Sequence, residues 1–574
     1  MRLSSLRIQN FRGIKDLTLE LEPDITVLIG ENNSGKTSIL EAIRFGLDAV
    51  KSDKTCSFTD YDFLRTETKD HVSQCDNIIL TYLFKETKDR DWDSGVVQEL
   101  DEVIVGDEYS LIKLRVSAWF DEKENECKQK WSFLDDHDNE MIKNQWKLKD
   151  LQRIRPFFFL SALRNAKQGF QAQSVYWSSF LKNKDIDSTT QKALENELEV
   201  ISKKIIDAHG SFREITGEVK RISELVTTAE ADAVSIDPAP SDIYRALRHN
   251  TQVNILTPEN AKIPLQQHGE GTQSLSVLLL FNAYLNSQLK RDVDKLAEPI
   301  IAIEEPEAHL HPNAIRSLWK LLCGLPGQKI IATHSGDILS EVPVNKLRRM
   351  NKNGIDIICK TLSDDILTNE ELRKFKHHVR RNRGELLFAK CWILVEGETD
   401  VSVISECAEL LSTNLSRHGI RIVEISQAGG PGIFIKVADA FGILWHLVAD
   451  KDTSGEKYIA NARDHLNGRN EASHITRLSQ SNMDILLCCN GYGKPYRDGV
   501  PDSKTSELTE NDGTPEYWSQ VYKIVSKTRG FSKPAAAIET IMMMQLKGVT
   551  GVPSEIKEII DKAIVLTGGS YDHV

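Results

Sequence analysis

The chain has 574 residues, of which 40% are hydrophobic, and its formal net charge is −12. A chain of this length is expected to form about three or four domains, and its hydrophobic content is sufficient for sizeable cores. The negative charge excludes a uniformly basic nucleic-acid-binding surface but leaves room for a local basic groove.

Targeting and redox features predict a cytoplasmic protein. Residues 1–8 alternate like a strand and lack the apolar core of a signal peptide. No uncharged apolar run reaches the roughly 18 residues of a membrane span. The nine cysteines are scattered and include no Cys-x-x-Cys pair, which indicates reduced thiols rather than disulfides or a zinc site.

A phosphate-binding loop is predicted near the N-terminus. Residues 25–30 read as a buried strand, residues 30–37 match the P-loop pattern, and helical periodicity follows. In such a loop the backbone N–H groups cradle phosphates, the lysine reaches the β- and γ-phosphates, and the threonine holds Mg²⁺. The predicted ATP-binding residues of this loop are Gly30, Asn33, Gly35, Lys36, Thr37 and Ser38.

The chain then changes character. Residues 1–160 alternate strand-like runs with polar turns, whereas residues 165–232 are polar and helix-prone, and a proline-containing break follows at 237–241. This stretch reads as a helical insertion between two halves of one ATPase, and it serves either as a packing helix or as a dimerisation arm. The predicted boundaries are 1–164 and 246–365 for the ATPase halves and 165–245 for the insertion.

A glycine-rich turn at residues 267–274 precedes a helical run in the second ATPase half. Such a turn at a helix N-terminus can bind an anion. In ABC-type ATPases, a signature turn of this kind completes the nucleotide site of the opposing subunit. Gly269 and Gly271 are therefore expected to contact ATP held by a second copy of the chain, which predicts at least a homodimer.

Two further apolar strands supply the acids and the histidine that an ATPase needs. Residues 299–303 run into Glu304 and Glu305. Glu304 stands at the Walker B position, in place of the usual Asp, and is expected to support Mg²⁺ through water, while Glu305 polarises the attacking water. His334 ends the next strand and is expected to sense the γ-phosphate, although a histidine at a strand end is usually structural.

A basic segment at residues 373–383 lies directly before the next apolar strand. It is either a solvated helix face or a phosphate-tracking surface beside the acids described next. The residues expected to contact DNA are Arg380, Arg381 and Arg383.

Four acids follow two buried strands. Glu396 ends the first strand, Asp400 follows one helical turn later, and Asp450 and Asp452 end the second strand. Acids gathered at one sheet edge repel one another unless a cation lies among them, and their oxygens suit Mg²⁺ or Mn²⁺. Two metals there would clamp a phosphodiester for in-line attack. The alternative is that these acids only cap strands and start helices.

These motifs resemble known families. The two acid-tipped strands resemble the Toprim domain of topoisomerases, primases and certain nucleases. Residues 5–13 resemble the opening of RecF- and SMC-like ATPases, and residues 304–312 and 380–397 resemble phrases of the OLD (overcoming lysogenisation defect) family. That family joins an ABC-type ATPase to a Toprim nuclease, and its members include the nuclease subunit of the Gabija anti-phage system and nuclease effectors found beside retrons.

The resemblance implies an α/β fold class, with an ABC-type (RecF/SMC-like) P-loop ATPase, a helical insertion, and a Toprim domain at residues 366–574. It implies Mg²⁺ or Mn²⁺ at the four acids, ATP with Mg²⁺ at the P-loop, and a nucleotide contact from Arg12. In the family, a later acid and a lysine also serve the nuclease site. Lys533, at the start of an apolar helix, matches the lysine but is equally well read as an exposed side chain. Glu516 is the provisional match for the acid.

The sequence as a whole predicts an ATP-regulated, divalent-metal-dependent DNA endonuclease for anti-phage defence. One alternative is an ATP-driven sensor or scaffold whose Toprim domain does not cut, and another is a RecF-like DNA repair ATPase. The expected partners are DNA, further copies of the chain through the ATPase heads, and a helicase or a reverse transcriptase with its retron DNA encoded nearby.

Overall fold

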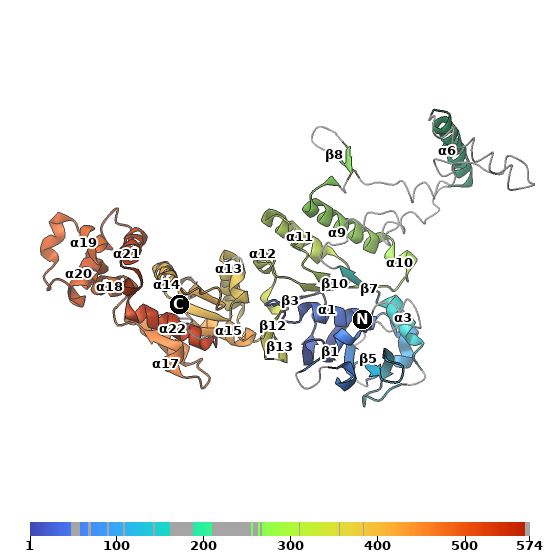
Figure 1. The fold of residues 1–574 in the computed structure, drawn as a ribbon, viewed down its shortest axis with the longest axis horizontal. Coiled ribbons are helices and arrows are strands. Elements are labelled where there is room, and N and C mark those ends of the chain that lie inside the picture. The colour runs from blue at the N-terminus through green and yellow to red at the C-terminus, as the bar shows by residue number, and fades with distance from the viewer. Residues whose placement is uncertain are drawn as a thin grey trace, which may run out of the picture. The chain divides into compact units, whose positions relative to one another are not determined.

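The structure is a computed structural model with two compact units, and Figure 1 labels their helices and strands. Unit 1 consists of Met1–Arg12, Glu20–Ile25 and Thr37–Ala332, and unit 2 of Gly13–Leu19, Thr26–Lys36 and Thr333–Val574. The described residues are 1–47, 58–66, 71–88, 91–106, 109–141, 144–160, 187–208, 254–256, 262–264, 267–308, 310–354, 356–382 and 384–568.

Unit 1 contains an antiparallel sheet with alternating burial. Its strands are, in spatial order, β1 (Leu3–Phe11), β4 (Ile78–Lys85), β5 (Leu111–Asp121) and β6 (Glu126–Leu134). Leu80 of β4 lies opposite Ile8 of β1 and Val116 of β5, and all three side chains are buried. The period of two places these apolar residues on one face of the sheet. Two short helices of this unit, α2 (Ser94–Leu100) and α3 (Lys147–Ile154), contact each other.

Three parallel strands of unit 1 carry the predicted Walker B acid. β10 (Ile300–Glu304) lies between β7 (Phe157–Leu160) and β11 (Gln328–Ala332). The apolar run of β10 and the complete burial of β11 are typical of parallel strands covered on both faces. Phe281 packs its ring 5.4 Å from that of Phe158. The helices that accompany these strands are α1 (Lys36–Leu47), α9 (Glu270–Ser287), α10 (Leu289–Asp292) and α11 (Pro312–Gly324).

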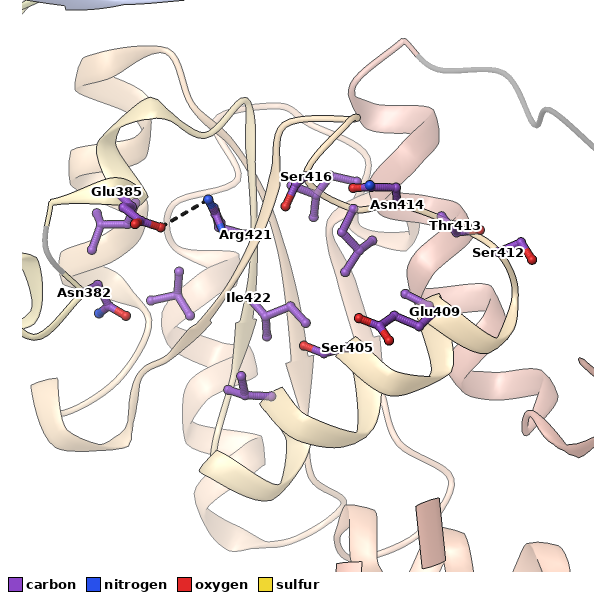
Figure 2. Close-up of a pocket in the computed structure, with 16 residues that line it drawn as sticks. Asn382, Glu385, Ser405, Glu409, Ser412, Thr413, Asn414, Ser416, Arg421 and Ile422 are labelled. Atoms are coloured by element: carbon purple, nitrogen blue, oxygen red, sulfur yellow. Dashed lines mark ion pairs between the residues drawn. The ribbon is translucent and has the colours of Figure 1, made fainter. Parts of the chain in front are cut away.

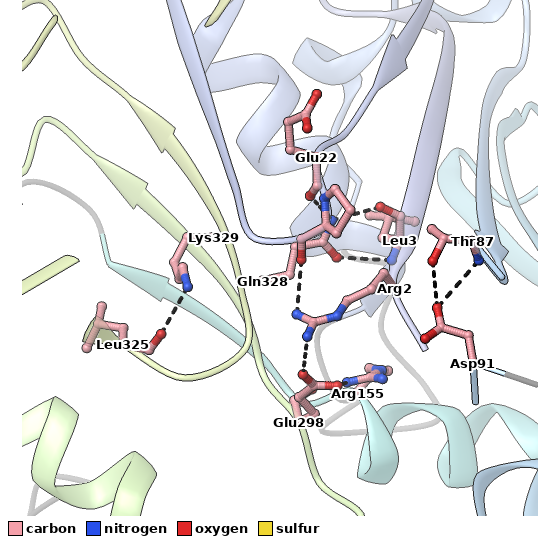
Figure 3. A network of polar contacts seen from close by, with 11 residues as sticks. Arg2, Leu3, Glu22, Thr87, Asp91, Arg155, Glu298, Leu325, Gln328 and Lys329 are labelled. Atoms are coloured by element: carbon pink, nitrogen blue, oxygen red, sulfur yellow. Dashed lines mark hydrogen bonds and ion pairs between the residues drawn. The ribbon is translucent and has the colours of Figure 1, made fainter. Parts of the chain in front are cut away.

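A polar network fastens the N-terminal strand to β11, as Figure 3 shows. The buried amide of Gln328 accepts the N–H of Leu3 at 3.0 Å and donates to the carbonyls of Leu3 and Glu22, both at 2.8 Å. Arg155 forms an ion pair with Glu298 close by. Buried polar groups are costly unless they are hydrogen-bonded, so this network fixes how the first strand meets the parallel strands.

The predicted insertion is described only in part. Helix α6 (Ser188–Ala208) is present, and Val200, Ile201 and Ile205 on it are exposed. Strands β8 (Asn254–Leu256) and β9 (Lys262–Pro264) form an antiparallel pair further along the chain. Residues 165–186 and 209–245 lie outside the described residues, so the dimerisation arm remains a prediction.

In unit 2, the strand that leads into the P-loop pairs with a strand of the second predicted ATPase half. β3 (Ile25–Gly30) runs parallel to β12 (Leu347–Asn353), which pairs antiparallel with β13 (Asp356–Lys360). All six residues of β3 are buried. Unit 2 also holds most of β2 (Ile14–Glu20) and the short helix α12 (Gly336–Leu339).

A parallel sheet forms the centre of the predicted Toprim domain. Its order is β15 (Ile420–Glu424), β14 (Cys391–Val395), β16 (Leu444–Ala449) and β17 (Ile475–Arg477). Successive residues of β14 pack on opposite faces of the sheet. Ile393 belongs to a core with α14 and α22, whereas Trp392 contacts Phe434 of α15. Burial on both faces explains why β14 reads as one apolar run. The surrounding helices are α13 (Asn369–Arg381), α14 (Glu398–Leu410), α15 (Gly432–Phe441), α16 (Thr453–Arg463), α17 (Glu471–His474) and α22 (Ser554–Leu566).

A helical subdomain follows β17 and has its own small core. Its helices are α18 (Met483–Leu487), α19 (Lys494–Asp498), α20 (Pro515–Val525) and α21 (Lys533–Lys547). Tyr496, Tyr517, Val521 and Ile524 are among the buried residues of this core. Among all described residues, no helix is both long enough and apolar enough to cross a membrane.

A buried arginine joins β12 to the Toprim sheet within unit 2. Arg349 is 4% exposed, and its guanidinium donates to the carbonyls of Leu387 at 3.1 Å, Ala389 at 2.6 Å and Phe441 at 2.9 Å. Lys390, directly before β14, also forms an ion pair of 3.3 Å with Glu31 of the P-loop. The strand that carries Glu396 is therefore tied at its start to β12 and to the P-loop.

Candidate functional site

The carboxyl ends of β14 and β16 bring two of the predicted acids together. The strands are parallel neighbours, with Trp392 opposite Trp445 and Leu394 opposite Leu447. Glu396 and Asp450 follow these strands, and the backbone N–H of Asp450 donates to Oε1 of Glu396 at 2.9 Å. The hydrogen bond fixes the first carboxylate relative to the start of the loop that carries the second.

Asp400 lies in the first turn of α14 and is 8% exposed. Its Oδ2 accepts the N–H of Gly397 at 2.9 Å, which closes the turn between β14 and the helix. The pKa of Asp400 is raised to about 7, mainly by burial; the charges of Asp484 and Glu396 also raise it, and the hydrogen bond from Gly397 lowers it.

Asp450 is the centre of the acidic cluster. Its pKa is raised to about 8, first by burial and then by the charges of Asp400, Glu396, Asp452 and Asp484. Like-charged carboxylates in a low-dielectric setting hold protons that ordinary acids lose. A divalent cation would remove both causes of the raised pKa, because it supplies charge and ligand bonds at the same place.

Asp452 has a structural role in addition to its predicted one. It is exposed and caps α16, where its Oδ1 accepts the N–H groups of Ser454 and Gly455, both at 2.8 Å. Its charge nevertheless acts on Asp450 and Glu396. The side chain of Asp452 therefore caps α16 and also acts electrostatically on the acidic cluster.

The structure adds one acid that the sequence analysis did not select. Asp484 in α18 is 6% exposed, and its charge raises the pKa of both Asp400 and Asp450. Glu516, the provisional choice, is exposed in the first turn of α20, and its charge acts on Cys489 instead. The available signal was a lone acid inside the apolar run Met483–Leu487, where an isolated charge is costly unless it has a partner.

Lys533 begins α21 and reaches toward this acid. Its Nζ donates to the hydroxyl of Tyr522 at 2.7 Å and lies 4.4 Å from the centroid of the Tyr522 ring. Its charge also lowers the pKa of Asp484, opposing the increase that burial causes. The structure thus places the predicted lysine in the neighbourhood of the acidic cluster, with the Tyr522 hydroxyl as its hydrogen-bond acceptor.

The donor set fits hard divalent cations. Carboxylate oxygens are the ligands that Mg²⁺ and Mn²⁺ prefer, and the acids here directly follow β14 and β16 or lie in α14 and α18. Within the described part of the chain, no three His, Cys, Asp or Glu side chains already enclose a metal position. Binding would therefore have to draw the carboxylates together.

A cavity lies elsewhere on the Toprim sheet. Figure 2 shows this pocket of about 710 Å³ between α14 and the edge strand β15, with Ser405 and Glu409 on one side and Arg421 on the other. Arg421 forms an ion pair with Glu385 at 3.2 Å. The residues that line this pocket include none of the acids of the cluster around Asp450. The pocket and the acidic cluster are therefore different places on the domain, and we take the acidic cluster as the candidate site.

The P-loop has the backbone conformation of an anion cradle. Asn33 and Gly35 have φ values of 63° and 88°. A Cβ on Gly35 would also approach Ile357 Cδ1 to 2.7 Å, so glycine is required there. The Nζ of Lys36 donates to the carbonyls of Gly30 at 2.9 Å and Glu31 at 2.8 Å. The lysine thus folds across its own loop, and Ser38 follows it in the first turn of α1.

The Walker B strand contacts the start of α1. The hydroxyl of Thr37 donates to the Oε1 of Glu304 at the end of β10. Glu305 has a φ of 46°, and its N–H donates to the carbonyl of Ala332 at 2.8 Å. Thr37 and Glu304 are thereby adjacent, as two residues that share a Mg²⁺ ion must be. Glu305 is a non-glycine residue in the left-handed region, and such strained positions often occur at functional sites.

The remaining predicted nucleotide contacts are spread over several elements. Gly269 is the N-cap of α9, and Gly271 lies in its first turn. His334 is exposed directly after β11 and its following threonine. Arg12 has a φ of 51° and forms an ion pair of 2.8 Å with Asp62.

Two of the three predicted DNA-contacting arginines are described. Arg380 and Arg381 end α13 and are exposed. Arg381 forms ion pairs with Glu398 and with Glu424, the second at 3.4 Å, and Arg380 lies 3.5 Å from Glu341. Arg383 lies outside the described residues. Arg381 therefore lies next to the turn that carries Glu396 and Asp400, already paired with acids.

A P-loop with its Walker B acid, followed by acids at the ends of parallel strands, defines a P-loop ATPase joined to a Toprim domain. The chain belongs to the family described as "Protein of unknown function (DUF2813)", whose model matches residues 1–385. A second model, described as "Overcoming lysogenization defect protein-like, TOPRIM domain", matches residues 387–452, the segment that contains the four predicted acids. The resemblance to the OLD family is thereby confirmed.

Several known proteins are similar to this chain. "Uncharacterized protein YbjD" of Escherichia coli is 29% identical and covers 100% of both chains. "OLD nuclease" of Thermus scotoductus is 26% identical over 78% of this chain and 82% of its own, and "Endonuclease GajA" of Bacillus cereus is 22% identical over 80% and 76%. A solved Smc head domain derived from Pyrococcus furiosus has a TM-score of 0.38 at 13% identity and covers 66% of this chain and 99% of its own.

Proposed function

We propose that this protein is an ATP-regulated, divalent-metal-dependent DNA endonuclease. The observation that carries the proposal is the acidic cluster at the carboxyl ends of β14 and β16, where Glu396 accepts the N–H of Asp450 and where Asp400 is buried beside them. The names of two relatives, OLD nuclease and Endonuclease GajA, support a nuclease activity.

Each residue of the cluster has a distinct part in the proposal. Glu396, Asp400, Asp450 and Asp452 hold Mg²⁺ or Mn²⁺, with Asp484 as the further acid. A metal held there would supply Lewis-acid chemistry, which polarises a phosphodiester and lowers the pKa of a water molecule. Lys533 donates hydrogen bonds to the phosphate undergoing attack, and Arg380, Arg381 and Arg383 contact the flanking phosphates. The ion pairs of Arg381 would then be exchanged for phosphate contacts when DNA binds.

The ATPase part is proposed to regulate cleavage. Lys36 and Thr37 bind the phosphates and Mg²⁺, Glu304 supports the metal, Glu305 orients the attacking water, and His334 senses the γ-phosphate. The Lys390–Glu31 ion pair and the Arg349 hydrogen bonds support a mechanical route, because they connect the P-loop and β12 to the segment that begins β14.

Assembly and biological context complete the proposal. Gly269 and Gly271 would contact ATP on a second copy, so that the heads close into a homodimer or a larger assembly. The resemblance to the OLD family, whose members include the Gabija nuclease subunit and retron-associated nucleases, supports a role in anti-phage defence, with a helicase or a retron reverse transcriptase as candidate partners. Light scattering at micromolar concentration with ATP tests the assembly, and a protein that stays monomeric would contradict the predicted contact.

The decisive experiment is cleavage of supercoiled plasmid by the purified protein with Mg²⁺ or Mn²⁺, each with and without ATP. We expect nicked or linear products only when a divalent cation is present, and a change in rate when ATP is added. Cleavage in excess EDTA would contradict the metal dependence. Identical rates with and without ATP would contradict the regulation.

One observation favours a second candidate function. Because no three acids of the described residues enclose a metal position, a sensor or scaffold ATPase whose Toprim domain binds a partner without cutting also accounts for the fold. The same experiment separates the two candidates. A protein that hydrolyses ATP and binds DNA, yet leaves plasmid intact with either metal, would be such a scaffold.

A further inference from the structure

Two tyrosines of the helical subdomain converge on the buried acid of α18. The hydroxyl of Tyr496 donates to Oδ1 of Asp484 at 2.5 Å, and Tyr496 itself is fully buried. The hydroxyl of Tyr522 lies near the same carboxylate and lowers its pKa. Asp484 therefore has two phenols as neighbours, one from α19 that donates a hydrogen bond and one from α20.

Tyr522 has a second partner of opposite charge. Its hydroxyl oxygen accepts a hydrogen bond from Nζ of Lys533 at 2.7 Å, and its ring lies under the ammonium, 4.4 Å from centroid to Nζ. Tyr522 thus stands between a lysine and a carboxylate that would otherwise attract each other directly. The half-buried setting strengthens that attraction, because charges interact more strongly away from bulk water.

The elements that carry these groups are held firmly. Val521 and Ile524, which flank Tyr522 in α20, are buried in the core of the helical subdomain. Ser532 caps α21 through a hydrogen bond from the N–H of Ala535, and Pro534 lies in the first turn directly after Lys533. The backbone positions of the tyrosine and the lysine are consequently set by packing and capping rather than by their mutual hydrogen bond.

We propose that Tyr522 is a positioning residue that keeps Lys533 out of the acidic cluster, so that the acids stay open to a divalent cation and the ammonium stays open to a DNA phosphate. The inference rests on the proposed nuclease function and names a residue that this function requires. An ammonium group has three N–H donors, and the Tyr522 hydroxyl uses one of them, which leaves donors for phosphate oxygens.

A direct lysine–carboxylate pair would be a competitor of the metal. If the hydroxyl were absent, Lys533 would move toward Asp484 and the neighbouring acids, and a cation would have to displace it. If Tyr522 were only a packing residue, its replacement by phenylalanine would leave metal binding unchanged. The two accounts therefore differ in what Tyr522→Phe does to metal binding, and in whether that effect depends on Lys533.

The test is a double-mutant cycle of Mn²⁺ binding, measured by isothermal titration calorimetry on the full-length protein at pH 8. The four proteins are the wild type, Tyr522→Phe, Lys533→Met and the double variant. We expect Tyr522→Phe to weaken Mn²⁺ binding by roughly tenfold or more, because the released ammonium of Lys533 then competes with the cation for the carboxylates. In the Lys533→Met background, the same substitution should leave Mn²⁺ affinity within about threefold, because the competing ammonium is gone.

Tyr517→Phe is the matched control, since Tyr517 lies on the same helix and in the same core but has Arg497 and Asp512 as polar neighbours. It should bind Mn²⁺ like the wild type. Plasmid cleavage should fall in both Tyr522→Phe and Lys533→Met.

The outcomes separate the inference from the proposed function. Unchanged Mn²⁺ affinity in Tyr522→Phe, or equal losses with and without Lys533, would overturn the spacer role even if the wild type cuts DNA. A wild type that binds Mn²⁺ but cuts no DNA would overturn the nuclease proposal, while the binding cycle still decides the role of Tyr522. A wild type that binds no Mn²⁺ would refute both.

Discussion

The backbone N–H of Asp450 donates a hydrogen bond of 2.9 Å to the side chain of Glu396. The two residues are far apart in the sequence, yet each directly follows a strand of one parallel sheet, and neighbouring parallel strands end at the same edge. The bond uses the main chain of Asp450 and leaves its carboxylate for other partners. A substitution that preserves the shape of Asp450 should therefore remove its charge without disturbing Glu396.

Asp450→Asn should abolish DNA cleavage and preserve the fold. Loss of one ligand from a metal site removes stabilisation of several kcal/mol, so the cleavage rate should fall at least about a hundredfold. The melting temperature should stay the same or rise, because the substitution removes a buried carboxylate that its neighbours repel. Plasmid nicking and calorimetric melting are the measurements. Asp464→Asn, at an exposed position after α16, is the control, and nicking by Asp450→Asn at the wild-type rate would remove Asp450 from the site.

Metal affinity should rise with pH. The folded-state pKa values of Asp400 and Asp450 are raised to about 7 and about 8, so both carboxyls are largely protonated at pH 6 without metal. A metal that binds carboxylates must displace these protons, and its apparent affinity should increase by up to about tenfold per pH unit for each proton released. Titration of Mn²⁺ at pH 6, 7 and 8 measures this slope. A pH-independent affinity would mean that the metal binds elsewhere.

The same groups set the sign of a stability effect. Because their pKa values are higher in the folded protein than in the unfolded chain, the contribution of these two groups to the stability of the metal-free protein should decrease as pH rises from about 4 through 8. Saturating Mn²⁺ should therefore raise the melting temperature more at pH 8 than at pH 6.

Glu305→Gln should bind ATP but hydrolyse it slowly. The carboxylate is the group proposed to orient the water, and its backbone is held by the N–H bond to Ala332, which the substitution retains. Lys36→Ala should instead weaken ATP binding, because the ammonium is lost from the loop. Nucleotide binding and phosphate release distinguish the two variants, with Lys320→Ala on the exposed side of α11 as a control. Normal hydrolysis by Glu305→Gln would shift the catalytic role to Glu304.

His446 should make the Toprim domain sensitive to acid. It is fully buried on β16, bonded to the carbonyl of Ser473 at 2.9 Å and to the hydroxyl of Thr476 at 3.0 Å, and burial lowers its pKa to about 4. The unfolded chain binds a proton near pH 6.5 and the folded chain does not, so the contribution of His446 to stability should fall as pH drops from about 6.5 to 4, in opposition to the contributions of Asp400 and Asp450.

Between pH 7 and 5, this single group should cost about 2 kcal/mol of unfolding free energy. Urea unfolding at the two pH values measures it. From pH 7 to pH 5, the unfolding free energy of His446→Gln should change more favourably than that of the wild type by this amount, whereas His377→Gln, at an exposed position of α13, should follow the wild type. An unchanged loss in His446→Gln would show that the acid sensitivity comes from other groups.

Neutralising Arg380, Arg381 and Arg383 together should weaken DNA binding equally for all sequences. Phosphate contacts release counterions, so the salt dependence of binding should also become shallower, by roughly one unit of log–log slope for each phosphate that the variant no longer neutralises. ATP hydrolysis without DNA should hardly change. Arg463→Gln, an exposed arginine paired with Glu471, is the control. Unchanged affinity and slope in the triple variant would place the DNA path elsewhere, for example around Lys533.

The sequence by itself determined the local elements and their order. Strand β3 with the P-loop after it, strand β10 with Glu304 at its end, and the two strands that precede Glu396 and Asp450 all form where apolar periodicity predicted them. Such patterns are legible because they depend on a few neighbouring residues, namely the burial of a strand and the turn chemistry that ends it. The adjacency of Glu396 and Asp450 also followed, since acids at the ends of parallel strands share one sheet edge.

Only the tertiary structure decided which distant elements join these acids. No sequence pattern around Asp484 or Tyr522 indicated that they lie near the acidic cluster. Glu516, which the sequence analysis chose as the further acid, is exposed in the first turn of α20. Arg381 looked like a free basic residue, but the fold pairs it with Glu398 and Glu424. The physical reason is that the docking of α18, α20 and α21 is set by the packing of their apolar faces, and the polar groups they carry come together as a consequence of that packing.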